Sequence, residues 1–300
     1  MKSNEYWIKR QRANKLKIIK LGENNISELK KLMLLNLLSV RKDIRNYYKR
    51  YGEEFNENLP AKEFKQYKKQ IRENAKKYPK DKVMQRILRE DAPKYKIDRL
   101  RQFETQLQTQ LSEITALQES GVKSALTESA RLSDELLLAT IQGGTNMVFN
   151  SIPEEKLLKI VNSTWIGGSN WSDKIWKDRA KLGKKLTKIL SIGVPQGYGM
   201  QQMARELSAV MGQTFSNSFR LIRTEASHID GQVTLDRYKE IQKELDENVK
   251  YRYDAFLDSR TSEICQELDN QIFDLDEVEV GVNYPPMHPN CRSTTNLVVV

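Results

Sequence analysis

Thiol and imidazole side chains gather in one stretch near the C-terminus. Both cysteines of the chain and one of its two histidines lie there, as Cys265, His288 and Cys291. Thiolate and imidazole groups are the usual ligands of zinc, and a structural zinc site takes four ligands. Asp258 or Asp269 would then supply the fourth ligand. Zinc is the one candidate cofactor of the chain, and we expect no other.

Two further interpretations of these residues stay open. The cysteines can pack as small buried apolar side chains while His288 bonds to a backbone carbonyl, or the two thiols can form a disulfide. A catalytic Cys–His pair would need a third group that orients the base. The flanking sequence shows no turn typical of an oxyanion site, so we expect no enzyme activity.

A second set of candidate residues carries charge on segments that we expect to converge. It comprises Arg223, Glu225, Asp258, Arg260 and Arg292. A lone buried charge destabilises a fold strongly, and an arginine can bind a carboxylate through two parallel hydrogen bonds. We therefore expect Arg–carboxylate pairs to tie the C-terminal loop to the helix of Arg223. A catalytic role for these charges is the alternative.

Formal charge is distributed unevenly along the chain. Residues 1–100 carry 28 Lys or Arg and 13 Asp or Glu, a net charge of +15, whereas residues 221–300 carry a net charge of −8. Lysine side chains neutralise phosphates without reading the base sequence. The candidates for nonspecific contact with double-stranded DNA are Lys62, Lys65, Lys68, Lys69, Lys76 and Lys77. A solvated helix face with mixed charges is the alternative.

The composition favours a helical protein with a large polar surface. Of the 300 residues, 38% are hydrophobic and 30% are charged, a balance typical of long helices rather than a dense α/β core. Two cysteines cannot form a disulfide scaffold, which indicates a reducing compartment. The longest apolar stretch, residues 32–40, is interrupted by Asn36 and is shorter than the ~20 residues that span a bilayer. We expect no membrane contact.

Apolar residues recur at steps of three and four through the N-terminal half, the period of a helix. A capping pair at Asn25 and Glu28 predicts a helix from there to about Gly52, preceded by a mobile arm over residues 1–20. Two further helices are expected, one from Leu100 to about Gly121 and the next over residues 122–141.

The C-terminal half changes from helices to a mixed pattern. The expected elements are a helix over 173–192, a short helix over 200–211 closed by Gly212, a long helix after it, a strand over 251–256, a short helix through 265–268 and a rigid proline-rich loop over 284–292. The predicted fold is mainly α, with elongated helical hairpins and a bundle, plus a small α+β C-terminal module. The expected domains are a basic helical arm (1–145), a helical part (146–248) and an α+β cap (249–300).

Three short motifs are specific in their combined spacing. They are Arg223-Thr224-Glu225, then Asp258-Ser259-Arg260-Thr261 with Cys265 four residues on, and then Pro285-Pro286-Met287-His288-Pro289-Asn290-Cys291-Arg292. On these motifs, residues 140–300 resemble the phage Mu F-like minor head protein family, also called phage head morphogenesis proteins. That family often has two further cysteines, at the positions where this chain has Ser262 and Ser293.

The resemblance implies a minor capsid protein of a tailed bacteriophage. Such a protein binds the portal inside the procapsid, meets capsid and scaffold proteins, and contributes to head assembly and to genome packaging and ejection. It is assembled in the cytoplasm of the bacterial host and ends in the virion. Some relatives carry a toxin domain, such as an ADP-ribosyltransferase, after this module; the sequence ends at Val300, so we expect none here. A zinc-dependent or ADP-ribosyl-transferring enzyme is the alternative function.

Overall fold

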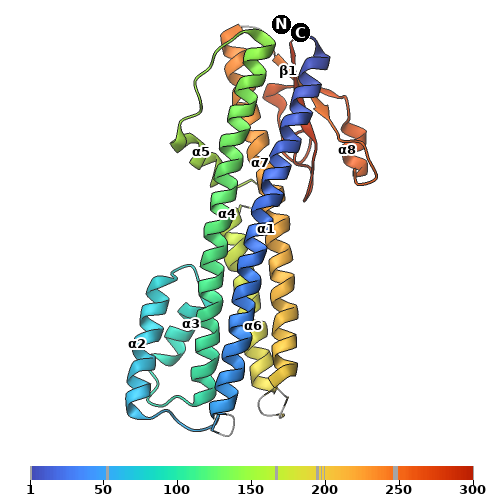
Figure 1. The fold of residues 1–300 in the computed structure, drawn as a ribbon. Helices are drawn as coiled ribbons and strands as arrows, with labels where there is room; N and C mark the ends of the chain where they lie inside the picture. Colours follow the sequence, from blue (N-terminus) through green and yellow to red (C-terminus); the bar gives the residue numbers. More distant parts are fainter. Residues whose placement is uncertain are drawn as a thin grey trace. The chain divides into compact units, whose positions relative to one another are not determined.

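Helices dominate the structure, a computed structural model that describes residues 2–51, 54–165, 168–193, 196, 198, 200–245 and 249–299. The long helices are α1 (Asn4–Tyr51), α4 (Arg99–Thr145) and α7 (Met200–Leu245) (Figure 1). The shorter ones are α2 (Ala61–Lys77), α3 (Lys82–Asp91), α5 (Glu154–Val161) and α6 (Trp171–Gly193). Within the described ranges, no helix is long and apolar enough to cross a membrane.

The chain divides into two compact units, and each of the three long helices contributes to both. Unit 1 comprises Met1–Ser27, Gly121–Trp171 and Phe219–Val300, and unit 2 comprises Glu28–Ser120 and Ser172–Ser218. These units differ from the consecutive ranges 1–145, 146–248 and 249–300 that the sequence suggested. The physical reason is that α1, α4 and α7 bury side chains along most of their length.

Unit 1 contains a small antiparallel sheet in the order β2-β1-β3. Its strands are β1 (Val249–Asp254), β2 (Ile272–Asp274) and β3 (Thr294–Val299), and Tyr251 of β1 lies opposite Phe273 and Leu297. Helix α8 (Glu263–Leu268) and the 3-10 turn η1 (Leu275–Glu277) complete the module. Alternate residues of β1 are fully buried, as the period of two predicts. The fold class predicted from the sequence, mainly α with a small α+β module, is confirmed.

The core of unit 1 joins the start of α1 to elements near the end of the chain. Trp7 is buried with residues of α4, α7, β1 and β3. Its ring lies against the backbone of α4, where a Cβ atom on Gly144 would come within 2.5 Å of the indole. A glycine is therefore required at this close approach.

The mobile arm predicted for residues 1–20 is wrong, because α1 begins at Asn4. Two of its basic residues form ion pairs with distant segments: the Lys15 ammonium lies 2.9 Å from Asp230, with only 3% of its side chain exposed. Arg12 bonds to Asp254 of β1. The predicted cap at Asn25 is also wrong, since Asn25 lies inside the helix and donates to Glu128.

The helix ends predicted at Gly121 and Gly212 are wrong as well, because α4 and α7 run through them. Buried side chains continue on both sides of each glycine, with Gln118 and Val122 in α4 and with Met211 and Ser218 in α7. A glycine inside a helix costs about 1 kcal/mol relative to alanine, which packing on both sides outweighs. The predicted helix over 173–192, the strand near 251–256 and the short helix through 265–268 are confirmed.

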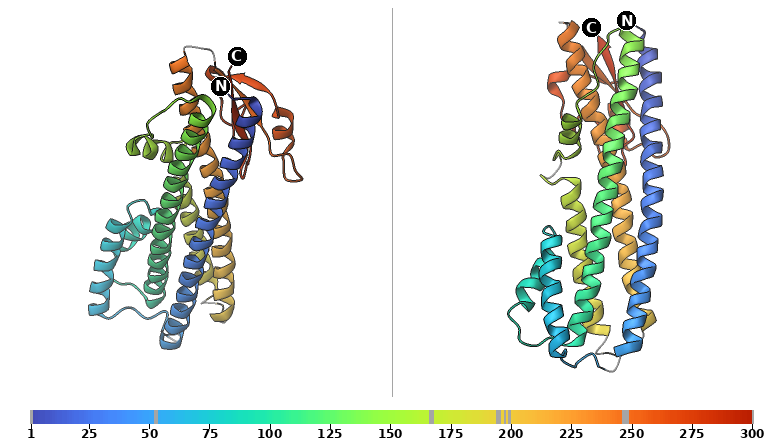
Figure 2. Two further views of the ribbon diagram at one scale, coloured as in Figure 1. Left: turned by 45° about the horizontal axis from the view of Figure 1, so that its top comes forward. Right: turned by 60° about the vertical axis from the view of Figure 1, so that its left-hand side comes forward.

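Unit 2 contains a helical hairpin, α2 and α3, which lies beside the first part of α4 (Figure 2). Asp81 caps α3, accepting hydrogen bonds from the amides of Val83 and Met84. The same carboxylate lies 3.2 Å from the Arg179 guanidinium of α6, and neither side chain is exposed to solvent. One carboxylate thus both begins a helix and holds a second helix against it.

Replacing Asp81 with alanine should destabilise unit 2 by about 3–5 kcal/mol, because it leaves the buried Arg179 charge without its carboxylate. The measurement is urea-induced unfolding of the full chain. The control is Asp178→Ala, which removes the partner of the exposed Lys181 and should cost less than about 1 kcal/mol. Equal losses in the two variants would contradict this account.

Candidate functional site

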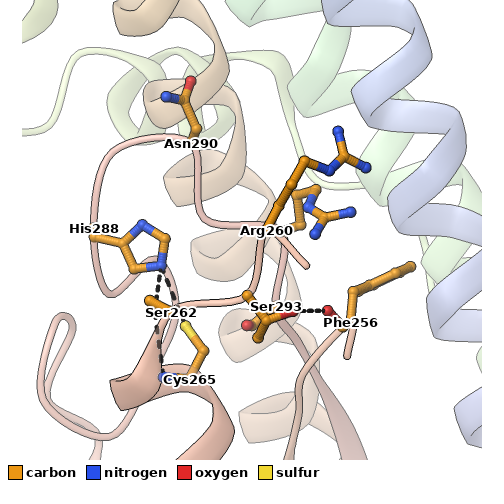
Figure 3. A pocket seen from close by; sticks show the side chains of 9 residues that line it. Phe256, Arg260, Ser262, Cys265, His288, Asn290 and Ser293 are labelled. Carbon is orange, nitrogen blue, oxygen red and sulfur yellow. Dashed lines mark hydrogen bonds between the residues drawn. The ribbon is translucent and has the colours of Figure 1, made fainter. Parts of the chain in front are cut away.

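The three potential metal ligands converge beside the small sheet. Cys265 lies in the first turn of α8, and His288 lies on the proline-rich loop (Figure 3). Cys291 follows three residues later on the same loop. The two Sγ atoms are 3.9 Å apart, and the Nε2 atom of His288 is 3.4 Å from Sγ of Cys265. The sequence predicted this grouping, and the structure places the residues together.

Helix α8 and the loop are positioned by local hydrogen bonds. Ser262 caps α8, and its hydroxyl accepts a hydrogen bond from the amide of Cys265. The loop, which includes a cis bond between Pro285 and Pro286, is fixed to α7. There the amide of Asn290 donates to the hydroxyl of Thr224. Thr224 therefore acts as an anchor for the loop.

A glycine on α7 allows the proline-rich loop to approach the helix. The hydroxyl of Tyr284 donates to the carbonyl of Gly231 at 2.8 Å. A Cβ atom on Gly231 would lie 2.9 Å from the carbonyl oxygen of Pro285, closer than side-chain carbons and backbone oxygens normally pack. A larger residue there would push the loop off the helix.

The pKa values of the two thiols, Cys265 and Cys291, are shifted in opposite directions. The hydrogen bond from Cys291 is the largest of several effects that lower the pKa of the Cys265 thiol, and the same contact raises the pKa of Cys291. Tyr253 donates to Cys265 at 3.3 Å, and burial raises the pKa of this phenol, so that it stays protonated. Of the two thiols, Cys265 is therefore the one that ionises more readily.

Access to the cluster limits its chemistry. Cys265 and Cys291 are 2% and 3% exposed. The adjoining cavity, lined by Ser262, His288, Ser293 and other residues, has a volume of about 20 Å³, which is room for about one water molecule. A peptide, sugar or nucleotide cannot reach the thiolate through it. The arrangement suits a metal ion or simple packing better than nucleophilic catalysis.

The second predicted set of charges comes together only in part. Arg292 forms a two-bond fork with Asp258, with N–O distances of 2.8 and 2.6 Å. The amide of Arg260 donates to the same carboxylate, but its guanidinium is 3.5 Å away and its side chain is 74% exposed. Thr261 closes the turn by accepting from the amide of Asp258 and donating to the carbonyl of Phe256.

The other two charges of that set lie elsewhere. Arg223 is exposed on α7. Glu225 is buried, and it accepts a hydrogen bond from the indole of Trp165 at 3.0 Å. The same indole stacks on the ring of His228 at a centroid distance of 4.4 Å. The expected link from Arg223 and Glu225 to the loop is therefore replaced by the contact of Thr224.

The carboxylates proposed as a fourth metal ligand are engaged in other contacts. Asp258 is held by Arg292, and Asp269 accepts from the amide of Ala255 at 2.8 Å. Sequence reasoning instead missed Ser262 and Tyr253, which both contact the cluster. The serine had a signal in its position three residues before Cys265, which is the spacing of a helix cap.

The predicted DNA-contact lysines lie on α2. Five of them, namely Lys62, Lys65, Lys69, Lys76 and Lys77, are exposed. Lys68 is half-buried, and its ammonium donates to the carbonyl of Ala92. The neighbouring aromatic residues Tyr67 and Tyr78 are 1% and 5% exposed, so they pack inside unit 2 and are not available to stack on bases.

Replacing Arg292 with alanine should raise the pKa of Asp258 toward the value of a free aspartate, about 4, while the Arg260 amide still lowers it. The fork is the main cause that holds this pKa well below its usual range. Because the folded-state value is depressed, the fork stabilises the fold above about pH 4, and this contribution is lost as the pH falls further. Carboxyl ¹³C NMR on aspartate-labelled protein measures the titration.

The matched control for that titration is Arg260→Ala, which should leave the pKa of Asp258 nearly as low as in the unaltered chain. The exposed Arg260 guanidinium is 3.5 Å from the carboxylate, whereas Arg292 is within 2.6 Å and only 20% exposed. Equal shifts in the two variants would show that no single arginine holds the loop.

Parts of the chain are similar to a known protein family and to a known protein. Residues 184–296 match the family model described as "Phage Mu protein F like protein". A protein of Enterococcus faecalis named NAD(+)–arginine ADP-ribosyltransferase EFV is 28% identical over 158 residues, which are 49% of this chain and 32% of that protein. The chain therefore spans about a third of this relative's length. No solved structure matches significantly.

The matched range contains the anchor Thr224, the Asp258–Arg292 fork and the Cys265–His288–Cys291 cluster, and it is narrower than the range 140–300 suggested by the motifs. The residues that carried the resemblance are thus the ones that build the loop and its platform on α7. Over residues 184–296, the chain is therefore similar to the family described as phage Mu protein F-like.

Proposed function

We propose that the protein is a minor head component of a tailed phage, bound to the portal inside the procapsid. There it contributes to head assembly and to genome packaging and ejection, among capsid and scaffold proteins assembled in the bacterial cytoplasm. The family match supports this role. In the structure, the role is supported by two different exposed surfaces of unit 2, one basic and one apolar, which suit two different partners.

The basic surface is the exposed side of α2. This helix carries seven Lys or Arg residues and two Glu residues. Its apolar face is buried through Tyr67, Ile71 and Ala75, which leaves the lysines directed away from the hydrophobic core. Since packaged DNA is a dense polyanion, such a face binds it by releasing counterions, without sequence preference.

Exchanging Lys62 and Lys65 for glutamine should weaken binding to duplex DNA and reduce the steepness of its salt dependence. Each phosphate contact contributes about 0.9 to the slope of log affinity against log salt concentration, so the slope should fall by about 2. Fluorescence anisotropy of the full chain on a labelled duplex, at several KCl concentrations, measures it.

The control for DNA binding exchanges Lys239 and Lys243, two exposed lysines one turn apart on α7, and should leave the slope unchanged. Binding by the unaltered chain that does not vary with salt would reject the DNA contact. So would an equal reduction of the slope in both double variants.

The apolar surface lies on the part of α1 that belongs to unit 2. Leu34, Leu35 and Leu38 are 48%, 66% and 57% exposed, and their spacing places them on one side of the helix. Leu29, Met33 and Leu37 form the opposite, buried stripe. Clustered exposed leucines mark a protein–protein contact, and we assign this face to the portal.

Replacing Leu35 with glutamate should abolish co-sedimentation of the protein with portal oligomers, because it puts a charge in the centre of the apolar face. Leu117→Glu is the matched control, since Leu117 of α4 is 52% exposed and lies outside that face. Retention of the Leu35→Glu variant with the portal, at the level of the control, would show that the portal binds elsewhere.

In this role the protein is not an enzyme. ADP-ribosyl transfer is the alternative that the name of the Enterococcus relative favours, but the match covers only 32% of that protein. The E-x-E pair of this chain, Glu277 and Glu279, is exposed at and just after η1. Zinc-dependent hydrolysis would need an H-E-x-x-H-like pair, or three ligands with a general base and room for a substrate, whereas the cavity beside His288 has room for about one water molecule.

A further inference from the structure

We propose that Cys265, His288 and Cys291 bind one Zn²⁺ ion, with a water molecule as the fourth ligand. Their ligand atoms all lie within 4.8 Å of one another. In a tetrahedral site, bonds of about 2.3 Å to sulfur and about 2.0 Å to nitrogen place two sulfurs about 3.8 Å apart, and sulfur and nitrogen about 3.5 Å apart. The two Sγ atoms are 3.9 Å apart, and Nε2 of His288 is 3.4 Å from Sγ of Cys265.

The tautomer of His288 directs a lone pair at the cysteines. Its Nδ1 atom is 3.0 Å from the carbonyl oxygen of Pro289. A carbonyl oxygen can only accept, so Nδ1 carries the proton and Nε2 carries the lone pair. Nε2 faces Cys265 and accepts from the Ser262 hydroxyl at 2.9 Å. A backbone carbonyl that fixes the far nitrogen is the usual support of a histidine metal ligand.

The surroundings suit a divalent ion held by thiolates. Two thiolates and a neutral imidazole balance the charge of Zn²⁺. An apolar shell that includes Tyr253, Ala255 and Met287 packs around the cysteines, and the Tyr253 hydroxyl donates to Cys265. Hydrogen bonds to a ligating sulfur and exclusion of solvent are both typical of protein metal sites.

The fourth coordination position faces the small cavity beside the triangle. Ser262, Ser293 and Asn290 help to line this cavity (Figure 3), and its volume of about 20 Å³ holds one water. The nearby carboxylates of Asp258 and Asp269 are occupied by Arg292 and by the Ala255 amide. A water supported by the serine hydroxyls therefore completes the site.

Such an ion would add a further link between two segments that the Ser262–His288 hydrogen bond already joins. Cys265 belongs to α8, whereas His288 and Cys291 belong to the loop that Thr224 anchors to α7. Zinc would thus fix α8 to the loop, and through it to α7. This role is separate from portal and DNA binding, which we assign to unit 2.

Elemental analysis of the purified full chain tests the site directly. After expression with added zinc and purification under reducing conditions, we expect about one zinc ion per chain. The variants Cys265→Ser, Cys291→Ser and His288→Asn should each lose most of the metal. Glu263→Gln, an exposed change on α8, should retain it and serves as the control.

A Co²⁺ titration of the unaltered chain covers the case in which those variants fail to fold. Tetrahedral coordination by two thiolates gives intense visible bands and a sulfur-to-cobalt charge-transfer band, both of which Zn²⁺ should displace. Neither band at saturating Co²⁺, together with less than about a tenth of an equivalent of zinc, would overturn the proposal. A mass two units low under non-reducing conditions in metal-free protein would do so too, since it would show a disulfide in place of the ion.

Discussion

Buried charge pairs between helices far apart in sequence are the interaction on which unit 1 depends. Lys15 of α1 lies 2.9 Å from Asp230 of α7, and Arg237 of α7 lies 2.5 Å from Asp134 of α4. Almost none of these side chains is exposed, apart from 11% of Asp230. Removing one partner of such a pair costs about 3–5 kcal/mol, so the pairs select one register of the helices. A chain with 30% charged residues can therefore still form a specific core.

Helix α7 is the platform on which the site is built. Asp230 and Arg237 hold it against α1 and α4, while Thr224 and Gly231 receive the proline-rich loop. The three residues of the Arg-Thr-Glu motif thus have different environments, although they are neighbours on one helix. Its threonine binds the loop, its glutamate binds Trp165, and its arginine lies in solvent. Through Thr224, the motif is thus part of a docking surface for the loop within the protein.

Sequence patterns predicted the features whose causes are local. The alternating residue types of β1 predicted a strand. The thiol and imidazole side chains of Cys265, His288 and Cys291 predicted that these three residues lie together. The need to pair charges near a rigid loop predicted Arg–carboxylate pairs, of which the Asp258–Arg292 fork formed, whereas the expected pairs to the helix of Arg223 did not. Sequence patterns did not predict the contacts of side chains whose partners lie far away in the sequence. The partner of Lys15 is 215 residues away, and the partner of Glu225 is 60 residues upstream, so neither pairing leaves a periodic trace.

The chain passes back and forth between the two units, and unit 2 is therefore fully synthesised before unit 1. All residues of unit 2 have been translated once Ser218 has been added. Unit 1 still lacks its sheet at that point, because β1 must pair with β3, whose last residue is Val299. The N-terminal turns of α1, including Trp7, must therefore wait until β3 has left the ribosome before their core can close. A nascent chain would expose this tryptophan until β3 has been synthesised and has paired with β1.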